Sequence, residues 1–418
     1  MTFQSPSKSF TARDYQFIGL VTILFLVVST ALVYANLTLT GGGDFYTHWV
    51  ASRGFIFDKI DPYSGQVPSR VQELVYGDSA QPGDEPYILD TPFQILLLYC
   101  PFSLLSDPLL ARALYTLLLE LALFALALLS LRLTNWEAPR FFSILCIFFC
   151  VANFYAFQAI LEASPVIVLG LFYTGILLAL RAEQDELAGA LMAVSLYYWE
   201  VGGAFLIFVA WRAYREGRSR FFAGFGMIAF VLLAVSFLVY PNWIIPYLRA
   251  GMNNLRADFG YSTQQIFTHL FFSQNGTYAW IFIGILIFAL GYEWNAAIQA
   301  DQRRFYWTAC LSLAVAPLLG FRSEMEHLVV LVIPFALIFS VVHDRWSRIG
   351  FWVTPLLLLI VFLLPWSAFF FALPFFGEDT GEIVFLFFPL STIIGLYWIR
   401  WWAIRPPRIW SDLIAHRE

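Results

Sequence analysis

Charged residues are scarce in this sequence. They make up 13% of the 418 residues, against about 25% in an average soluble domain, while 60% of the residues are hydrophobic and 19% are aromatic. So few charges cannot cover the surface of such an apolar chain in water, which excludes a soluble enzyme and a disordered protein. The net charge of −5 excludes the broad basic surface that a nucleic-acid binder needs. The composition is typical of a membrane protein with many spans.

Cysteine is also rare. The four cysteines all lie in apolar runs, and Cys146 and Cys150 share one helix face without forming a Cys-x-x-Cys pair. Small buried side chains explain this pattern better than a metal site or a disulfide framework. We therefore expect no metal centre built from these thiols.

Ten apolar runs approach the ~20 residues that a helix needs to cross a bilayer. The first follows Lys8 and Arg13 and is too long for a signal-peptide core, so we expect it to be retained. The sequence predicts an all-α integral membrane protein with one polytopic domain over residues 1–418. The ten runs are 17–39, 108–131, 141–157, 163–181, 221–240, 278–298, 305–320, 328–342, 350–374 and 383–400.

A further apolar segment, 187–211, carries charges at both ends. We expect it to cross the membrane twice, as two short helices that meet near Trp199 and Glu200, which gives twelve crossings. With cytoplasmic termini, 17 of the 24 basic residues then lie on the cytoplasmic side, as the positive-inside rule requires. A single crossing would destroy this asymmetry.

Two extracytoplasmic segments are too long to be simple connections. The first, 40–107, is acidic and contains a stretch, 45–57, in which polar and aromatic residues alternate at helical spacing. That pattern favours a helix lying in the membrane interface. Residues 91–105 are apolar but short and contain Pro101, which predicts a second interfacial or re-entrant piece. The second segment, 242–277, carries the polar residues Asn253, Asn254, Arg256, Asp258, Gln264, Gln265 and His269.

Unusual ionisable residues gather on this same side. Asp44 follows the first apolar run, Glu162 stands between two runs, and Glu200 lies at the tip of the short pair. Ionisable groups at membrane depth are costly and usually mark a site. With Asp44 as the catalytic candidate, the candidates for substrate binding are Tyr46, His48, Tyr63, Glu162, Glu200, Arg249, Arg256, His269, Arg322, Glu324 and His327.

Each of these residues also has a structural explanation. Asp44 after a glycine run could cap a helix that begins at Phe45. Glu162 and Glu200 could lie above the hydrocarbon and be solvated. The segment 322–327 could be a solvated turn whose internal ion pair is worth under about 1 kcal/mol. A metal bound by Glu324, Glu326 and His327 is not expected, because their spacing alone is weak evidence.

An acidic site at the outer interface suits the transfer of a sugar from a lipid-linked phosphate donor. A carboxylate would accept the proton of the attacking hydroxyl in one inverting displacement, and an arginine would hold the leaving phosphate. Asp44 fits the first role, and Arg322 or an arginine of 242–277 fits the second. Partial desolvation would make Asp44 a stronger base. A monophosphate is already a good leaving group, so no metal is required.

Several short motifs occur in order along most of the chain. They are Asp44-Phe45-Tyr46, Asp61-Pro62-Tyr63, Tyr87 to Pro92-Phe93, Glu162-Ala163-Ser164-Pro165, Ala188-Gly189 and Ser323 to His327. This order resembles the GT-C glycosyltransferases, specifically glycosyltransferase family 87, the polyprenol-phosphate-mannose-dependent α-1,2-mannosyltransferase type. The resemblance implies a GT-C bundle, a base at Asp44, an outward-facing site and no required metal. It also implies a polyprenyl-phosphate-sugar donor, a lipid or glycan acceptor, and no further cofactor or nucleic-acid partner.

The chain departs from the family pattern at three places. It reads Leu161-Glu162 where the family commonly has Gly-Gln, Trp199-Glu200 where a Lys-Pro is common, and Thr91-Pro92 in place of Pro-Pro. Two added carboxylates and a lost lysine change the charge around the donor site. The alternatives are a transporter or flippase of lipid-linked sugars and a non-catalytic membrane subunit. Transporters commonly carry inverted repeats and midplane broken helices, whereas here the polar residues gather at one interface and the first outside segment is long.

Overall fold

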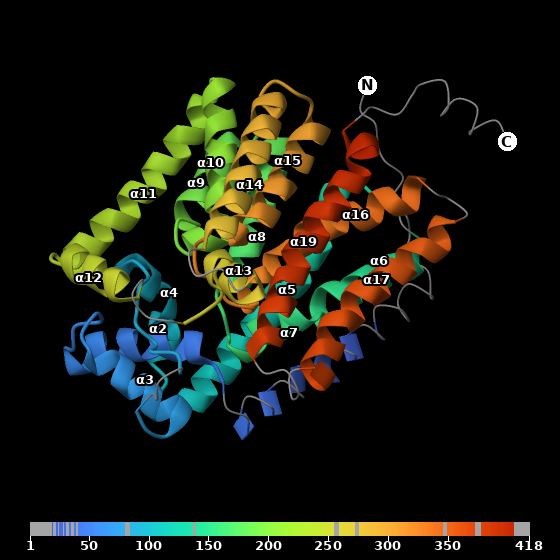
Figure 1. The fold of residues 1–418 in the computed structure, drawn as a ribbon. Helices are drawn as coiled ribbons and strands as arrows, with labels where there is room; N and C mark the ends of the chain where they lie inside the picture. Colours follow the sequence, from blue (N-terminus) through green and yellow to red (C-terminus); the bar gives the residue numbers. More distant parts are fainter. Residues whose placement is uncertain are drawn as a thin grey trace.

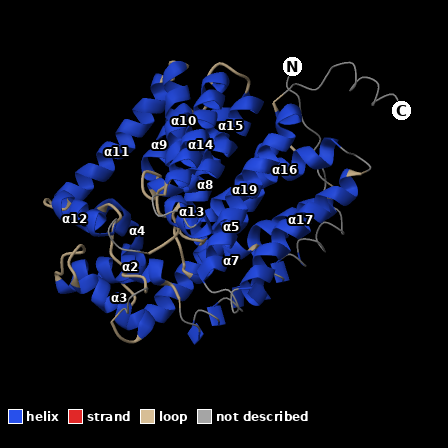
Figure 2. Ribbon diagram, in the orientation of Figure 1, coloured by secondary structure: helices blue, strands red, loops and turns tan. Residues whose placement is uncertain are grey.

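The fold is known from a computed structural model. It describes residues 41–79, 84–136, 139–254, 259–271, 276–345, 349–372 and 378–404, together with scattered positions between 19 and 38. Within these ranges the chain is helical, with no strand and one isolated β-bridge (Figure 2). The all-α prediction is confirmed. Of the predicted first helix, 17–39, the structure describes scattered positions, and these are helical.

Six described helices are long and apolar enough to cross a membrane, and a bent pair could make a seventh. The 27-residue α5 would span about 40 Å at 1.5 Å per residue, more than the ~30 Å hydrocarbon core. The six are α5 (Pro108–Thr134), α11 (Ser219–Val239), α14 (Thr277–Ala297), η3 with α16 (Glu326–Arg345), α17 with most of η4 (Gly350–Phe371), and the part Thr380–Ala403 of α19.

The bent pair consists of α6 (Arg140–Ala152) and α7 (Phe154–Leu161), which meet at 46°. The side chain of Asn153 accepts hydrogen bonds from the backbone N–H groups of Tyr155 and Ala156 and so starts the second helix afresh. Large apolar side chains also lie open on the outside of the bundle, for example Phe230 at 73% and Leu238 at 83% exposed. Such a surface suits lipid rather than water, so the chain is a multi-pass membrane protein.

The segment 187–211 forms two helices, as the sequence predicts. They are α9 (Asp185–Val194) and α10 (Trp199–Arg215), with a break between them in which Tyr198 takes a left-handed backbone conformation. α9 packs closely along α11: a Cβ added at Gly189 would lie 1.9 Å from the carbonyl oxygen of Phe221. Small residues therefore set this close helix contact.

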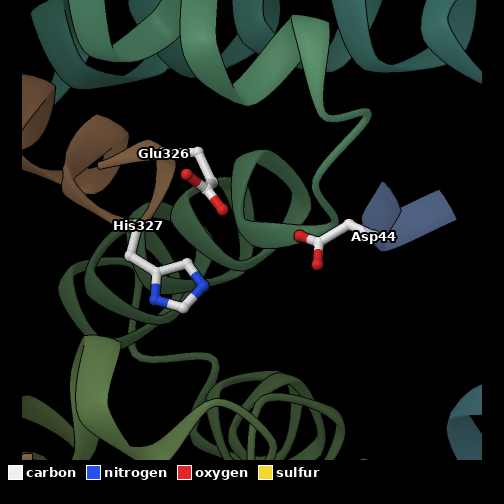
Figure 3. A group of neighbouring side chains, drawn as sticks. All are labelled: Asp44, Glu326 and His327. Atoms are coloured by element: carbon white, nitrogen blue, oxygen red, sulfur yellow. The ribbon is translucent and has the colours of Figure 1, made fainter. Parts of the chain in front are cut away.

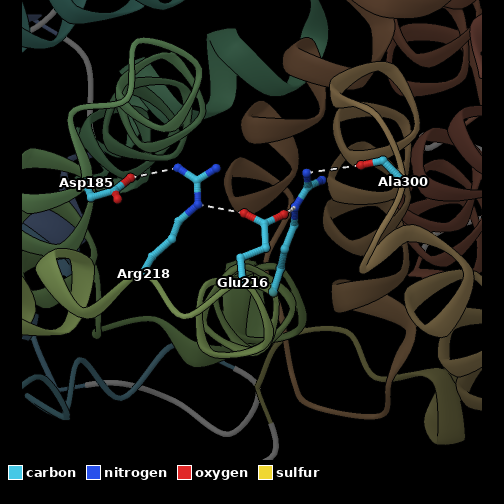
Figure 4. A network of polar contacts seen from close by, with 5 residues as sticks. Asp185, Glu216, Arg218 and Ala300 are labelled. Atoms are coloured by element: carbon cyan, nitrogen blue, oxygen red, sulfur yellow. Dashed lines mark hydrogen bonds and ion pairs between the residues drawn. The ribbon is translucent and has the colours of Figure 1, made fainter.

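A polar network joins the far ends of these helices (Figure 4). Arg218 pairs with Asp185 at 2.8 Å and with Glu216 at 2.6 Å, and Arg212 pairs with Glu216 at 2.5 Å. Arg212 also donates to the carbonyl oxygen of Ala300 at 3.2 Å. Glu200 and Arg212 are twelve residues apart on α10, or about 18 Å. The arginine-rich end of the bundle is therefore remote from Glu200.

The segment 40–107 folds into α2 (Gly43–Arg53), η1 (Gly54–Asp58), α3 (Gln66–Tyr76) and α4 (Phe93–Ser103). The helix predicted over 45–57 is confirmed, but its environment differs from the prediction. Residues 45–52 are all buried, whereas a helix at a membrane surface leaves one face open. α2 is instead enclosed by α4, α3 and α5, and its aromatic side chains pack in the core between these helices.

The remaining helices complete the bundle (Figure 1). In the described parts of segment 242–277 the chain forms the helices α12 and α13. Figure 1 shows α12 beside α2 and α4, at the end where α11 finishes. The bounds are α8 (Val166–Arg181), α12 (Ile244–Asn254), α13 (Thr263–Phe271), α15 (Gln302–Val315), η2 (Ala316–Leu318), η3 (Glu326–Leu331), α16 (Val332–Arg345), α17 (Gly350–Ser367), η4 (Ala368–Ala372) and α19 (Glu378–Ala403).

Candidate functional site

A pocket of about 160 Å³ lies where four distant parts of the chain meet. The start of α2, the segment 85–90, the tip of α10 and the turn before η3 all contribute to its wall, and α12 closes it with Gly251 and Asn254. The carboxylates in the wall are Asp44, Glu85, Asp90, Glu200 and Glu324. Of the predicted site residues, Asp44, His48, Glu200, Arg322, Glu324 and His327 line the pocket.

Asp44 lies in the first turn of α2 but does not cap it. The N-cap residue is Gly42, whose φ is +84°, and no side-chain cap hydrogen bond is made. The capping alternative is therefore wrong, although a carboxylate near a helix N-terminus still gains from the helix dipole. The Oδ2 atom of Asp44 is buried and has no hydrogen-bond partner among the described residues.

Glu162 supports this turn from behind. Its Oε2 atom accepts a hydrogen bond from the backbone N–H of Gly43 at 3.1 Å, which satisfies one of the free donors of the helix end. Arg112, 1% exposed, donates to the carbonyl oxygen of Leu161 at 3.2 Å. A Cβ at Gly42 would lie 2.5 Å from Arg112 Nε, so the arginine packs directly on the glycine turn. Glu162 is therefore a supporting residue, and does not line the pocket.

Burial, followed by the charge of Glu324, raises the pKa of Asp44 well above its usual value. Burial is also the main cause that raises the pKa values of Glu85, Asp90 and Glu162, with Glu324 contributing in each case. Asn254 opposes the shift at Asp90 through a 2.7 Å hydrogen bond. Carboxylates crowded into one partly dehydrated space thus hold protons more tightly.

His48 is fixed as a neutral side chain. Its Nδ1 lies 2.7 Å from the carbonyl oxygen of Asp44 and its Nε2 lies 3.0 Å from Thr91 Oγ1, so Nδ1 donates and Nε2 accepts. The ring stacks on Tyr99 with centroids 4.6 Å apart. Burial lowers the pKa of His48 to about 4. His48 therefore orients Asp44 through the backbone and brings no positive charge.

The turn at 322–327 is held against the bundle rather than solvated. Ser323 pairs with Tyr261 through two backbone hydrogen bonds, of 2.8 and 2.9 Å, and Ser323, Glu326 and His327 are each at most 5% exposed. The N–H of Glu324 donates to His327 Nδ1 at 3.2 Å, which places the ring proton on Nε2. Figure 3 shows Asp44, Glu326 and His327 pointing toward one another.

Other predicted residues lie elsewhere. Tyr46 is buried beneath Arg112, whose guanidinium lies 5.9 Å from its ring centre. Tyr63 donates to the carbonyl oxygen of Thr91 at 2.9 Å and so braces the wall from outside. His269 pairs with the buried Glu382 at 2.7 Å. Arg249 is exposed on α12, and Arg256 lies outside the described residues.

Sequence reasoning missed Glu85, Asp90 and Glu326 as site residues. The sequence shows that all three are acidic, and Glu85 and Asp90 flank Tyr87 in the long first segment. The charge pattern alone does not separate these site residues from the other acidic residues nearby. Only the folding of 84–92 back over α2 brings Glu85 and Asp90 into the wall.

Among the residues that the structure describes, two groups of three side chains have ligand atoms within 4.8 Å of one another: Asp44, Glu326 and His327, and Asp44, Glu85 and Glu324. The first group is a poor metal site, because Nδ1 of His327 already accepts hydrogen bonds and its Nε2 carries the proton. The second offers only carboxylate oxygens, a donor set that suits a hard cation such as Mg²⁺ or Ca²⁺.

No protein-family model matches this chain, and a search of curated proteins finds no similar sequence.

Proposed function

We propose that this protein is a membrane glycosyltransferase with a GT-C-like bundle. It transfers a hexose, mannose-like in the simplest case, from a polyprenyl-phosphate donor to a lipid or glycan acceptor. The proposed topology has twelve crossings, with both termini in the cytoplasm and the pocket on the extracytoplasmic side of the cell membrane. The arrangement of charge supports this orientation, since the Arg212–Arg218 network lies at the end of α10 remote from Glu200.

One observation carries the proposal. Asp44 Oδ2 is buried, unpartnered and placed in a pocket, and its pKa is raised by its surroundings. A carboxylate of this kind is suited to accept a proton from a sugar or lipid hydroxyl. The helix end, Glu162 and His48 hold its backbone, so the side chain starts close to its working position.

In the proposed reaction, Asp44 takes the hydroxyl proton of the acceptor as its oxygen attacks the anomeric carbon. The bond from that carbon to the phosphate oxygen breaks, and the polyprenyl phosphate leaves with the electron pair. A single displacement of this kind inverts the configuration at the anomeric carbon. Arg322 is the one arginine among the described residues that line the pocket, and it would hold the phosphate at the rim.

The metal-independent mechanism is part of the proposal. A monophosphate leaving group needs no bridging cation, and a cation bound by Asp44 would occupy the oxygen that must accept the proton. Glu85 and Glu324 would then shape the sugar-binding wall instead of holding an ion. The proposed partners are the donor, the acceptor and the surrounding lipid, with no resident cofactor.

The test is transfer by the purified protein in proteoliposomes. Radiolabelled polyprenyl-phosphate-mannose and polyprenyl-phosphate-glucose serve as donors, and a total bacterial lipid extract serves as acceptor. We expect the label to move from the donor into a new lipid product. Movement of intact donor across the bilayer without a new product would support the flippase alternative. The absence of both transfer and donor movement would support a non-catalytic subunit.

A further inference from the structure

The pocket has a strong excess of acid over base. Its wall holds five carboxylates and, among the described residues, one arginine. Neither histidine in the wall adds a positive charge that would offset the carboxylates, since His48 is neutral and the Nδ1 of His327 acts as an acceptor. Oxygens of Asp44, Glu85 and Glu324 lie within 4.8 Å of one another. The pocket wall therefore brings three acids close together.

Such crowding is relieved by a positive charge on the ligand. A neutral hexose can donate hydroxyl hydrogen bonds to the carboxylates but leaves their like charges uncompensated, and a phosphate inside the pocket would be repelled. The phosphate of a donor can lie at the rim near Arg322, so the part of the donor inside the pocket is the sugar. The positive charge must therefore be carried by the sugar. Complementary charge is the usual way in which a site selects its ligand.

His327 gives independent information about the ligand. The residue is 5% exposed and lines the pocket, and its hydrogen bonds to described residues use Nδ1. Figure 3 shows the ring directed toward Asp44 and Glu326. The Nε2–H can therefore donate to an acceptor oxygen on a ligand. A small molecule that carries both hydroxyl oxygens and a positive charge would therefore complement the pocket.

We propose that the sugar bound here carries a protonated primary amine, which Glu85 and Glu324 hold beside Asp44. This inference rests on the proposed glycosyltransferase function and narrows its substrate to amino sugars. Glu85 comes from the segment 84–92, and Glu324 comes from the turn fixed by Tyr261 and Ser323, so the two carboxylates belong to segments far apart in the sequence.

The experiment compares three monosaccharides that share one ring. Glucosamine, glucose and N-acetylglucosamine are titrated against the protein in lipid nanodiscs at pH 7 by saturation-transfer NMR. We expect glucosamine to bind at least ~10-fold more tightly than the two uncharged sugars. Glu324→Gln and Glu85→Gln should each remove most of this preference. Glu73→Gln, which changes an exposed glutamate on α3, should keep it.

Equal binding of the three sugars, or a preference that survives Glu324→Gln combined with Glu85→Gln, would overturn the inference. So would displacement of glucosamine by micromolar Mg²⁺ or Ca²⁺, which would assign the three acids to a cation. The proposed function fails separately: it fails if no donor gives a transferred product, even where the amine preference is present. Transfer of mannose without an amine preference would contradict the inference alone.

Discussion

The Oε2 atom of Glu162 accepts a hydrogen bond from the backbone N–H of Gly43 at 3.1 Å, across 119 residues of sequence. This contact fixes the first turn of α2 and with it the position of Asp44. A Cβ at Gly43 would lie 2.1 Å from the ring of Tyr87, so the turn is also closed from the other side. Asp44 is therefore positioned by the backbone of a glycine turn.

This contact predicts a difference between two substitutions. Glu162→Gln keeps an acceptor for the Gly43 N–H, so transfer activity should stay within a few-fold of the wild type. Glu162→Ala leaves that buried N–H unsatisfied, at a cost of about 1–3 kcal/mol, and should lower both activity and the melting temperature. Initial rates and thermal unfolding in detergent measure both effects. Equal damage by Gln and Ala would mean that the charge of Glu162 acts on the substrate.

A second prediction concerns pH. Because burial and Glu324 raise the pKa of Asp44, kcat/KM should rise with pH along a limb that lies above the ~4 of an ordinary aspartate. Glu324→Gln removes one negative neighbour, so the limb should move to lower pH. The measurement is the pH–rate profile of each variant, with Glu73→Gln as the control. A limb that does not move in Glu324→Gln would contradict the assignment of Asp44 as the base.

The apolar runs predicted most of the helices, because a long apolar stretch in a membrane has no other way to satisfy its backbone. α11 and α14 coincide with the runs at 221–240 and 278–298 to within two residues at each end. The break before Trp199 was predictable from charge alone, since both ends of the segment carry arginines and acids. The same sorting of charges between the two membrane sides predicted that Asp44, Glu200 and Glu324 lie on one side.

The environment of α2 could not be predicted in this way. Its polar and aromatic residues have the same spacing in a surface helix as in a buried one, and only the folding of α4 and α5 around it decides between them. The places of Glu85 and His269 depend on the path of chain segments with little periodicity. Glu85 turns into the pocket, whereas His269 turns to Glu382, whose position in α19 no local pattern indicates.

A third prediction tests the packing of α9 on α11. Gly189→Leu would place side-chain atoms where the carbonyl oxygen of Phe221 lies, so it should destabilise the protein by on the order of 3 kcal/mol. Gly226→Leu on the exposed face of α11 is the matched control, because a Cβ there meets no atom within 4 Å. Thermal unfolding in detergent should show a lower midpoint for Gly189→Leu alone. Equal midpoints would contradict the close contact.

A fourth prediction follows from the proposed metal-independent mechanism. Transfer measured after dialysis against EDTA should equal transfer before it, because the leaving phosphate needs no cation. The control is the same protein dialysed without chelator. Activity that is lost and then restored by Mg²⁺, Mn²⁺ or Ca²⁺ would instead place a cation among Asp44, Glu85 and Glu324.

The central claim is that Asp44 is the general base. The most direct measurement is single-turnover transfer from radiolabelled polyprenyl-phosphate sugar by the wild type, Asp44→Asn and the exposed control Asp78→Asn, all in proteoliposomes. Asp44→Asn keeps the shape of the side chain and removes its basicity, so the rate should fall by about 10²–10⁴-fold while donor binding persists. Asp78→Asn should match the wild type. An unchanged rate in Asp44→Asn would contradict the account.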